Sequence, residues 1–303
     1  MKLTILERDD EITHVALAGR LDTTGAEEIN QSLSEATAGK NRPAIVDLSG
    51  VEFMASRGIA ILFANSKKLK QAGHKLVLLN PQEMVEGVVT ATKMDKAMPI
   101  AHDLDEAVQI ARGDRGPAAA VRPRPATAAE QFVPRQDVPV SPAAAPREGA
   151  VKVVIKNESS ELAPLNATLG QFLRDHSVPS RASYAVNLAI DELVVNVMRY
   201  AYADANTHFI EVELAVESDH VILRIVDDGR PFDPRKGPAL DLNAEDREIG
   251  GLGLILVLEM VDVLRYQRVE NKNRVEVRIR LIPDEASGHP AQAAAESVAP
   301  GGA

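Results

Sequence analysis

Two polar residues on one predicted helix, Glu192 and Asn196, have the types and the spacing to act on a phosphorylated ligand. Residues four apart lie on one stripe of a helix, so their side chains are neighbours. The amide oxygen of Asn196 is a hard, neutral ligand that suits Mg²⁺, which also takes triphosphate oxygens. A Glu one turn earlier is placed to accept a proton from an attacking hydroxyl. The alternative interpretation is a solvated helix face, because this spacing is common by chance.

Two glycine-containing segments follow this helix in the chain. Asp227 and Gly229 end an apolar strand, where the carboxylate is suited to accept from an exocyclic amino group such as that of adenine. Gly229 would let the backbone approach a flat base closely. Gly251 and Gly253 open an apolar helix, whose N-terminus offers N–H groups and a positive dipole end to phosphate. The plainer interpretations are a turn after the strand and tight helix packing.

The stretch between these segments, residues 230–248, is rich in Pro and Asp and is interpreted as a mobile lid. Its Arg247 would reach a terminal phosphate, and a solvated Arg is the alternative. The glycines do not form a dinucleotide-binding fingerprint, because Leu256 stands where the third Gly should and a loop precedes them.

A serine in the first half of the chain, Ser56, lies between an apolar strand at 43–48 and a predicted helix at 58–71. Ser is a common N-cap at such a position, and this is the structural alternative. The same position would expose the hydroxyl to a docking enzyme. A phosphate added there would lie on helix N–H groups, and its charge of about −2 would repel an acidic partner surface.

Strand and helix patterns divide the chain into two folded segments, 1–112 and 151–283. Strands and helices alternate in the first, which favours a small α/β layer fold. The second combines helices with mostly antiparallel strands, as in an α+β sandwich. Residues 113–150 are Ala, Pro, Arg and Gln with almost no large apolar residue, so we expect a disordered linker there. The tail at 284–303, rich in Ala, Gly and Ser, is interpreted in the same way.

Composition excludes several classes of function. The chain has 303 residues, enough for two ordinary domains, and a net charge of −10, which argues against nucleic-acid binding. The absence of Cys excludes disulfides and Cys-based zinc sites. No apolar run approaches the roughly 18 residues of a membrane helix, and the N-terminus has the pattern of a strand and not of a signal peptide. We therefore expect a cytoplasmic protein without a membrane or nucleic-acid partner.

The order of the motifs carries more information than each motif alone. The sequences Asp-Glu-Leu-x-x-Asn-x-x-x-Tyr-Ala-Tyr, Asp-Asp-Gly-Arg-Pro-Phe-Asp-Pro and Ile-Gly-Gly-Leu-Gly-Leu follow one another in 151–283. This segment resembles the Bergerat-fold ATPases, which include gyrase, Hsp90 and histidine kinases, and most of all the anti-sigma factor serine kinases. The resemblance implies ATP and Mg²⁺ as cofactors. It implies Glu192 as the general base, Asn196 as the Mg²⁺ ligand and Asp227 as the partner of adenine. It also implies that Gly251 and Gly253 belong to the phosphate-binding loop.

The first segment also resembles a known family. Leu-Ala-Gly-Arg-Leu-Asp ending at Asp22, together with Phe-Met-Ala-Ser-Arg-Gly around Ser56, resembles the STAS domains of anti-sigma factor antagonists over about 1–110. Those domains commonly show Asp-Ser-x-Gly with the Ser phosphorylated, which implies Ser56 as the phosphoacceptor. Gly58 matches this pattern, but Ala55 replaces the Asp. A constitutively unphosphorylated binding module is therefore the open alternative.

Together the two resemblances imply an α/β STAS domain with a mixed sheet, fused through a disordered Ala/Pro-rich linker to an α+β Bergerat ATP-binding sandwich. They imply a partner-switching protein-serine kinase, whose partners are a STAS-domain antagonist in its own or another chain, a sigma factor and a PP2C-type phosphatase. A homodimer is a further expectation from the family. The alternatives are a non-catalytic, ATP-gated clamp with a STAS docking module, and a stand-alone ATPase.

The linker permits the two segments to meet within one chain. As a flexible coil, roughly 37 residues span about 30–37 Å, which is enough to reach across a small domain. Tethering raises the effective concentration to near mM. We hypothesise that the STAS domain occupies its own kinase until Ser56 is modified. The sequence leaves open whether transfer occurs in cis or in trans, and what the output partner is.

Overall fold

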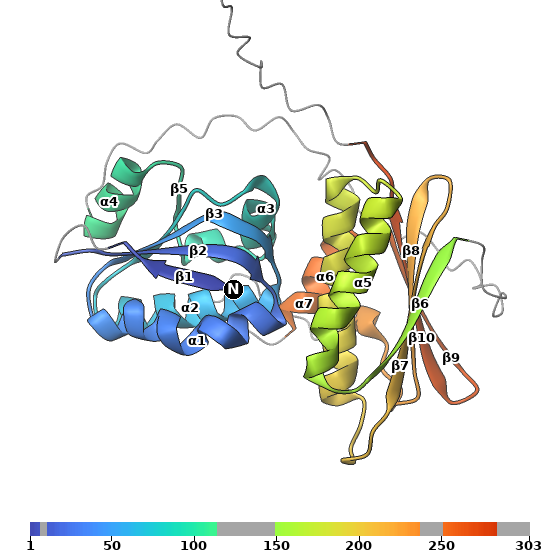
Figure 1. Ribbon diagram of the computed structural model, residues 1–303. Helices are drawn as coiled ribbons and strands as arrows, with labels where there is room; N and C mark the ends of the chain where they lie inside the picture. The colour runs from blue at the N-terminus through green and yellow to red at the C-terminus, as the bar shows by residue number, and fades with distance from the viewer. Residues whose placement is uncertain (7–10, 114–148, 237–250, 284–303) are drawn as a thin grey trace, which may run out of the picture.

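The computed structural model describes residues 1–6, 11–113, 149–236 and 251–283 (Figure 1). The described residues form two units, each built on a five-stranded sheet. Helices of the second unit stand between its own sheet and the first unit (Figure 1). Nearly all of the predicted linker and the whole predicted tail fall outside the described residues.

The sheet of the N-terminal unit is mixed, in the order β1-β2-β3-β4-β5. Its first two strands form an antiparallel hairpin, and each following neighbour is parallel. The strands are β1 (Lys2–Ile5), β2 (Thr13–Leu21), β3 (Ala44–Met54), β4 (Leu76–Leu79) and β5 (Ile100–Ala101).

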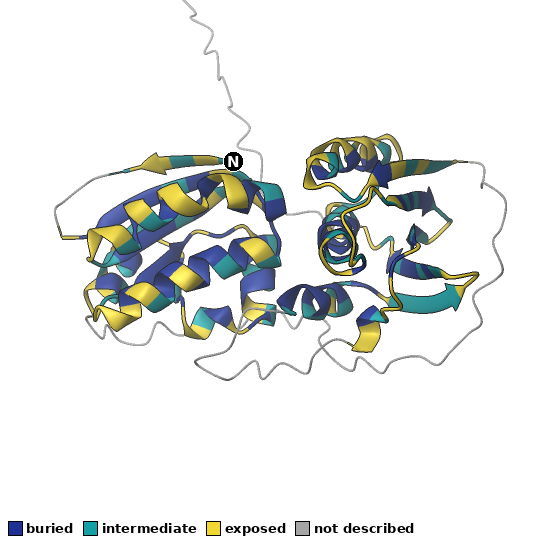
Figure 2. Ribbon diagram, turned by 90° about the horizontal axis from the view of Figure 1, so that it is seen from below, coloured by how far each residue is buried: buried dark blue, intermediate teal, exposed yellow. Residues whose placement is uncertain are grey.

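Helices cover both faces of this sheet. They are α1 (Thr23–Ala36), α2 (Ser56–Gln71), α3 (Glu83–Ala91) and α4 (Leu104–Arg112), with short 3₁₀ turns at Ala38–Lys40 and Met94–Lys96. Val46 and Leu78 pack in one core with α1, α2 and α3, while Ile45 and Val77 pack with α4 on the opposite face. The helices are buried towards the sheet and exposed on their outer sides (Figure 2). Burial on both faces explains why β3 and β4 begin as continuous apolar runs.

The sheet of the C-terminal unit is antiparallel throughout, in the order β6-β7-β8-β10-β9. Along its strands, apolar residues such as Leu214 and Leu223 pack against helices, and charged residues such as Glu213 and Arg224 alternate with them. The strands are β6 (Ala150–Lys156), β7 (Phe209–Val216), β8 (His220–Asp227), β9 (Val263–Val269) and β10 (Lys272–Arg280); the helices are α5 (Leu162–Asp175), α6 (Ser180–Tyr200) and α7 (Leu252–Met260), and 3₁₀ turns lie at Ser159–Glu161 and Pro234–Lys236.

The α/β layer fold and the α+β sandwich expected from the sequence are confirmed. One difference matters for function: β3 does not stop near Leu48 but continues to Met54, almost to the start of α2. Gly50 makes this continuation possible, because a Cβ there would lie only 2.9 Å from the Cβ of Ala18 on β2. The extended strand therefore ends two residues before Ser56. Among the described helices, none has the length and apolar character needed to cross a membrane.

One hydrophobic cluster joins the two units. Tyr184 and Leu188 of α6, and Leu252 and Leu256 of α7, are buried in the same cluster as the core between α1, α2 and the N-terminal sheet. Three of these four side chains are fully buried, and Tyr184 is 7% exposed. The units therefore share packed apolar surface, with α6 and α7 on the C-terminal side of the junction.

Candidate active site at the junction of the two units

The helix α6 has two faces with different roles. Ala189, Ile190 and Leu193 pack in the core of the C-terminal unit. Asp191 and Glu192 contact the N-terminal unit instead, and both are buried although they are charged residues. Buried carboxylates are rare unless they are hydrogen-bonded. The residues that donate to Asp191 and Glu192 therefore show which part of the N-terminal unit this face of α6 contacts.

Glu192 contacts Ser56, which lies 136 residues away in the sequence. The Ser56 hydroxyl donates to Oε2 at 2.7 Å, and the Ser56 backbone N–H donates to Oε1 at 2.7 Å. Ser56 is the first residue of α2, so the carboxylate lies where free N–H groups and the helix dipole favour an anion. The alternative that Ser56 is an N-cap is wrong. Ala55 occupies the N-cap position, and the hydroxyl is bonded across the junction to Glu192.

Gly253 packs directly against the Glu192 side chain. A Cβ on this glycine would overlap the Glu192 carboxylate, so no other residue fits without displacing it. Gly251 is the N-cap of α7 and has a φ of 85°, a left-handed conformation that glycine adopts without strain. The structure thus brings Ser56, Glu192 and the glycines that open α7 into one place.

Burial raises the pKa of the Glu192 carboxyl, and the two hydrogen bonds from Ser56 and the charge of Arg199 oppose this shift. A carboxylate with a raised pKa is a better proton acceptor near neutral pH than an exposed one. The geometry and the electrostatics therefore both suit Glu192 to accept the hydroxyl proton of Ser56.

Asp191 makes a parallel contact that sequence reasoning missed. Its Oδ2 accepts from the Thr23 hydroxyl at 3.0 Å and from the Thr23 N–H at 3.3 Å. Thr23 is the first residue of α1. Burial, with the nearby charges of Glu192 and Asp22, raises the pKa of Asp191 to about 7. Two consecutive carboxylates of α6 thus accept hydrogen bonds from the first residues of two helices of the N-terminal unit.

Tyr184 anchors the same helix to the end of β3. Its hydroxyl accepts from the Met54 N–H at 3.1 Å and donates to the Met54 carbonyl at 3.0 Å. Its ring packs 4.8 Å from that of Phe53, centroid to centroid. Buried aromatic residues with a satisfied hydroxyl are typical anchors of interfaces. Tyr184 carried no signal in the sequence, because it has the same helical spacing as a core residue.

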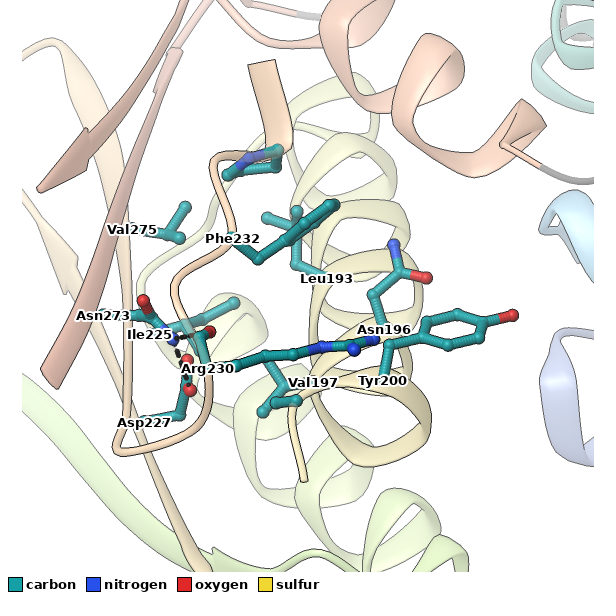
Figure 3. A pocket seen from close by; sticks show the side chains of 12 residues that line it. Leu193, Asn196, Val197, Tyr200, Ile225, Asp227, Arg230, Phe232, Asn273 and Val275 are labelled. Carbon is teal, nitrogen blue, oxygen red and sulfur yellow. Dashed lines mark hydrogen bonds between the residues drawn. The ribbon is translucent and has the colours of Figure 1, made fainter. Parts of the chain in front are cut away.

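A pocket of about 180 Å³ lies between α6 and the C-terminal sheet. Asp227 and Asn273 lie at one end of it and Asn196 and Tyr200 at the other (Figure 3). Its lining residues are Leu193, Asn196, Val197, Tyr200, Ala201, Ile225, Asp227, Arg230, Phe232, Pro234, Asn273 and Val275. The pocket therefore has a mostly apolar wall with a few polar groups, as small-molecule sites commonly do.

The carboxylate of Asp227 is held rigidly at its end of the pocket. Its Oδ1 accepts from the Gly229 N–H at 2.9 Å and from the Asn273 side-chain amide at 2.7 Å. Within the described part of the chain, no hydrogen bond reaches Oδ2, which leaves that oxygen as an acceptor for a ligand. Burial raises the pKa of Asp227, and the bonds from Asn273 and Gly229 oppose the shift.

Gly229 also has a steric reason to be glycine, since a Cβ there would overlap the Cβ of Ala201 at the end of α6. Asn273 is a site residue that the sequence analysis did not single out. It lies in β10 opposite Asp227 on β8, so the register of the closing strands would have revealed it.

The residues expected to hold a nucleotide and Mg²⁺ lie in two neighbouring places along α6, one at the pocket and one beside Glu192. Asn196 and Asp227 line the pocket, Gly229 packs against Ala201 next to it, and Glu192 lies one turn from Asn196 beside Gly253. No cluster of three or more His, Asp or Glu side chains forms a metal site among the described residues. The donor set fits an ion held mainly by ligand phosphates and water, with the Asn196 oxygen as its protein ligand. Arg247 lies outside the described residues.

Comparison with known protein families agrees with both resemblances. The STAS domain model matches residues 4–107, and the model of the histidine kinase-like ATPase domain matches residues 155–279. The chain therefore contains a STAS domain followed by a histidine kinase-like ATPase domain, and the second domain implies ATP binding.

Individual relatives are distant. The serine/threonine-protein kinase BtrW of Bordetella bronchiseptica is 27% identical over 107 residues, which are 35% of this chain and 75% of that protein. The anti-sigma-F factor antagonist RsfB of Mycobacterium tuberculosis is 27% identical over 101 residues, 33% of this chain and 82% of that protein. A crystal structure of an anti-sigma factor antagonist from Mycobacterium paratuberculosis is 28% identical, with a TM-score of 0.33, and the match covers 37% of this chain and 95% of that one.

Proposed function

We propose that this protein is an ATP- and Mg²⁺-dependent protein-serine kinase that phosphorylates Ser56 of its own STAS domain, within a partner-switching circuit. The observation that carries the proposal is the 2.7 Å hydrogen bond from the Ser56 hydroxyl to Glu192, made between two domains of one chain. The proposal divides the chain into a STAS domain at 1–112 and a kinase domain at 151–283. The names of the relatives BtrW and RsfB support both halves of it.

In the proposed reaction, Glu192 accepts the hydroxyl proton of Ser56. The Oγ lone pair then forms the new bond to the γ-phosphorus of ATP, while the bond from that phosphorus to the bridging oxygen breaks and ADP leaves with its electron pair. The buried carboxylate suits this role, because its raised pKa favours holding the proton it receives. Alignment of the hydroxyl across the junction supplies the positioning on which phosphoryl transfer depends.

The remaining residues bind and orient the nucleotide. Asp227 accepts from the adenine amino group through its open oxygen, and the Gly229 N–H holds the carboxylate in place through the other oxygen. Gly251 and Gly253 offer backbone N–H groups at the start of α7 to the phosphates. Mg²⁺ held through Asn196 would neutralise phosphate charge during transfer. We also propose Arg247 as a ligand of the terminal phosphate.

The phosphorylated STAS domain is expected to dissociate from α6. A phosphoryl group on Ser56 would bring a charge of about −2 against Glu192 and its neighbour Asp191. Because both carboxylates are buried, screening by solvent is weak there. Transfer would therefore separate the STAS domain from α6 and uncover the kinase surface for another STAS antagonist or a sigma factor. A PP2C-type phosphatase would reverse the step.

One observation favours the second candidate, an ATP-gated clamp without transfer. Glu192 accepts the backbone N–H of Ser56 as well as the hydroxyl, which is also how a carboxylate would hold a helix permanently in place. The clamp predicts that Glu192→Gln weakens docking without any chemistry to lose. The kinase predicts that the same change removes phosphate transfer.

The test is mass spectrometry of the intact full-length protein after incubation with Mg-ATP. We expect one phosphoryl group on the wild type, mapped to Ser56, and none on Ser56→Ala or Glu192→Gln. Ser49→Ala and Glu259→Gln are matched controls at exposed positions and are expected to behave as wild type. An unmodified wild type that binds ATP, or a phosphoryl group on another residue, would contradict the kinase proposal.

A further inference from the structure

The contact between Asp191 and Thr23 has the form of the Ser56–Glu192 contact but not its surroundings. Thr23 and Asp191 are buried, with 5% and 2% of their surfaces exposed. The atoms nearest to a Cβ built at Gly253, at the start of α7, all belong to Glu192. Ser56 is therefore the hydroxyl whose carboxylate partner lies beside a glycine proposed to bind phosphate, and the contact of Thr23 calls for another role.

We infer that Asp191 is a positioning residue, which sets the orientation of the STAS domain on α6 by receiving the N-terminus of α1 through Thr23. The inference rests on the proposed function, since it explains how Ser56 is delivered to Glu192. It also names a specificity determinant: the kinase domain recognises STAS domains whose first helix begins with a hydroxyl-bearing residue.

Geometry requires more than one fixed point. A contact at Ser56 alone would leave the STAS domain free to rotate about it. Asp191 fixes a second helix end, and Tyr184, two turns earlier on α6, fixes the end of β3 through Met54. These buried contacts from one helix to α1, α2 and β3, together with the shared apolar cluster and the more exposed Arg199–Glu27 ion pair at 3.2 Å, define a single orientation.

The chemistry of the helix ends supports the same assignment. Neither α1 nor α2 has an acidic residue in its first turn, and α2, whose N-cap is Ala55, has no side-chain cap of its own. Asp22, the N-cap of α1, uses its side chain for the Gly25 N–H and leaves the Thr23 N–H to Asp191. Asp191 and Glu192 of α6 thus accept from the first backbone N–H groups of α1 and α2.

The contact between Asp191 and Thr23 depends on hydrogen-bond donors to the buried Asp191 carboxylate. Asp191 faces Glu192 on its own helix and Asp22 on α1, and Asp22 is itself paired with Arg20 at 3.0 Å. In this acidic setting the Thr23 hydroxyl is one of the groups that satisfy the buried Asp191 oxygen. Loss of a hydrogen bond to a buried charged group costs about 1.5–3 kcal/mol, which corresponds to roughly a tenfold to hundredfold change in an equilibrium constant.

The test uses the full-length protein and compares Thr23→Val with Thr23→Ser, which keeps the hydroxyl. Hydrogen exchange of the Ser56 amide, measured without nucleotide, reports docking. We expect exchange to become about tenfold faster or more in Thr23→Val, and to return close to the wild-type rate in Thr23→Ser. Thr24→Val, at the next residue of the same helix, is the control and should leave exchange unchanged. Asp191→Asn keeps an oxygen for Thr23 and should dock better than Asp191→Ala.

Two results would overturn the inference. One is a Ser56 amide equally protected in Thr23→Val and wild type. The other is exchange in Thr23→Ser that is as fast as in Thr23→Val, since a purely structural role would not be rescued by the hydroxyl. The exchange readout needs no ATP, so it decides the role of Asp191 even if no phosphoryl group reaches Ser56.

Discussion

Ser56 and Glu192 share two hydrogen bonds, one from the hydroxyl and one from the backbone N–H, each 2.7 Å long and each to a different carboxylate oxygen. The group proposed to take the proton of Ser56 is therefore also the group that completes the first N–H of α2. Recognition of the acceptor helix and activation of its hydroxyl are carried by one side chain. Any change that moves Glu192 should affect docking and transfer together.

Gly253→Ala is the most local way to move Glu192 without altering either reacting residue. The new methyl group would overlap the Glu192 carboxylate, so the side chain or α7 must shift. We expect the rate of Ser56 phosphorylation to fall by about 100-fold or more, because positioning by about 1 Å is worth that much. Gly87→Ala, where a Cβ meets open space, is the control. A normal rate in Gly253→Ala would show that this close packing is not needed for transfer.

Asp227→Asn should weaken ATP binding, because an amide nitrogen facing the adenine amino group replaces an acceptor by a donor. We expect an increase in the dissociation constant of about tenfold to hundredfold, measured by calorimetry. Asp228→Asn changes the adjacent residue, whose side chain is 54% exposed, and should have little effect. Equal effects of the two changes would argue against Asp227 as the adenine partner.

Tyr184→Phe removes the hydroxyl that bonds both backbone groups of Met54 but keeps the ring that packs on Phe53. We expect the free energy of unfolding in urea to fall by about 1–3 kcal/mol, the cost of leaving buried polar groups unpaired. Tyr200→Phe, at a side chain that is 57% exposed, should change it by about 0.5 kcal/mol or less. If the two variants are equally stable, the Tyr184 hydroxyl contributes nothing to the junction.

The raised pKa of Asp191 predicts a pH dependence with a definite sign. Its pKa rises from 3.8 to about 7 in the folded protein, so the folded state holds a proton that the unfolded state has released. The stability contributed by this group is complete below pH 3.8 and is lost as pH rises to about 7. The free energy of unfolding of wild type, minus that of Asp191→Asn, should therefore fall over this range and level off above it. A difference that rises with pH would contradict the assignment.

The fold and part of the candidate site could be predicted from the sequence, because both depend on local patterns in the chain. Apolar periodicity determines the elements, and Glu192, Asn196 and Asp227 belong to local motifs on those elements. Thr23 and Tyr184 gave no such signal, because their partners lie 168 and 130 residues away. Hydrogen bonds between domains depend on docking, which leaves no period in the chain. The apolar run ends at Leu48, so the pattern gave no sign that β3 continues to Met54, where Gly50 allows close approach to β2.

The most direct test of the account is the rate of Ser56 phosphorylation as a function of protein concentration at saturating Mg-ATP. Because the hydroxyl is already bonded to Glu192 of the same chain, the account predicts a first-order rate constant that does not change over a hundredfold dilution. A rate constant that falls in proportion to dilution would show that the acceptor and the base belong to different molecules. That result would contradict transfer within the docked chain.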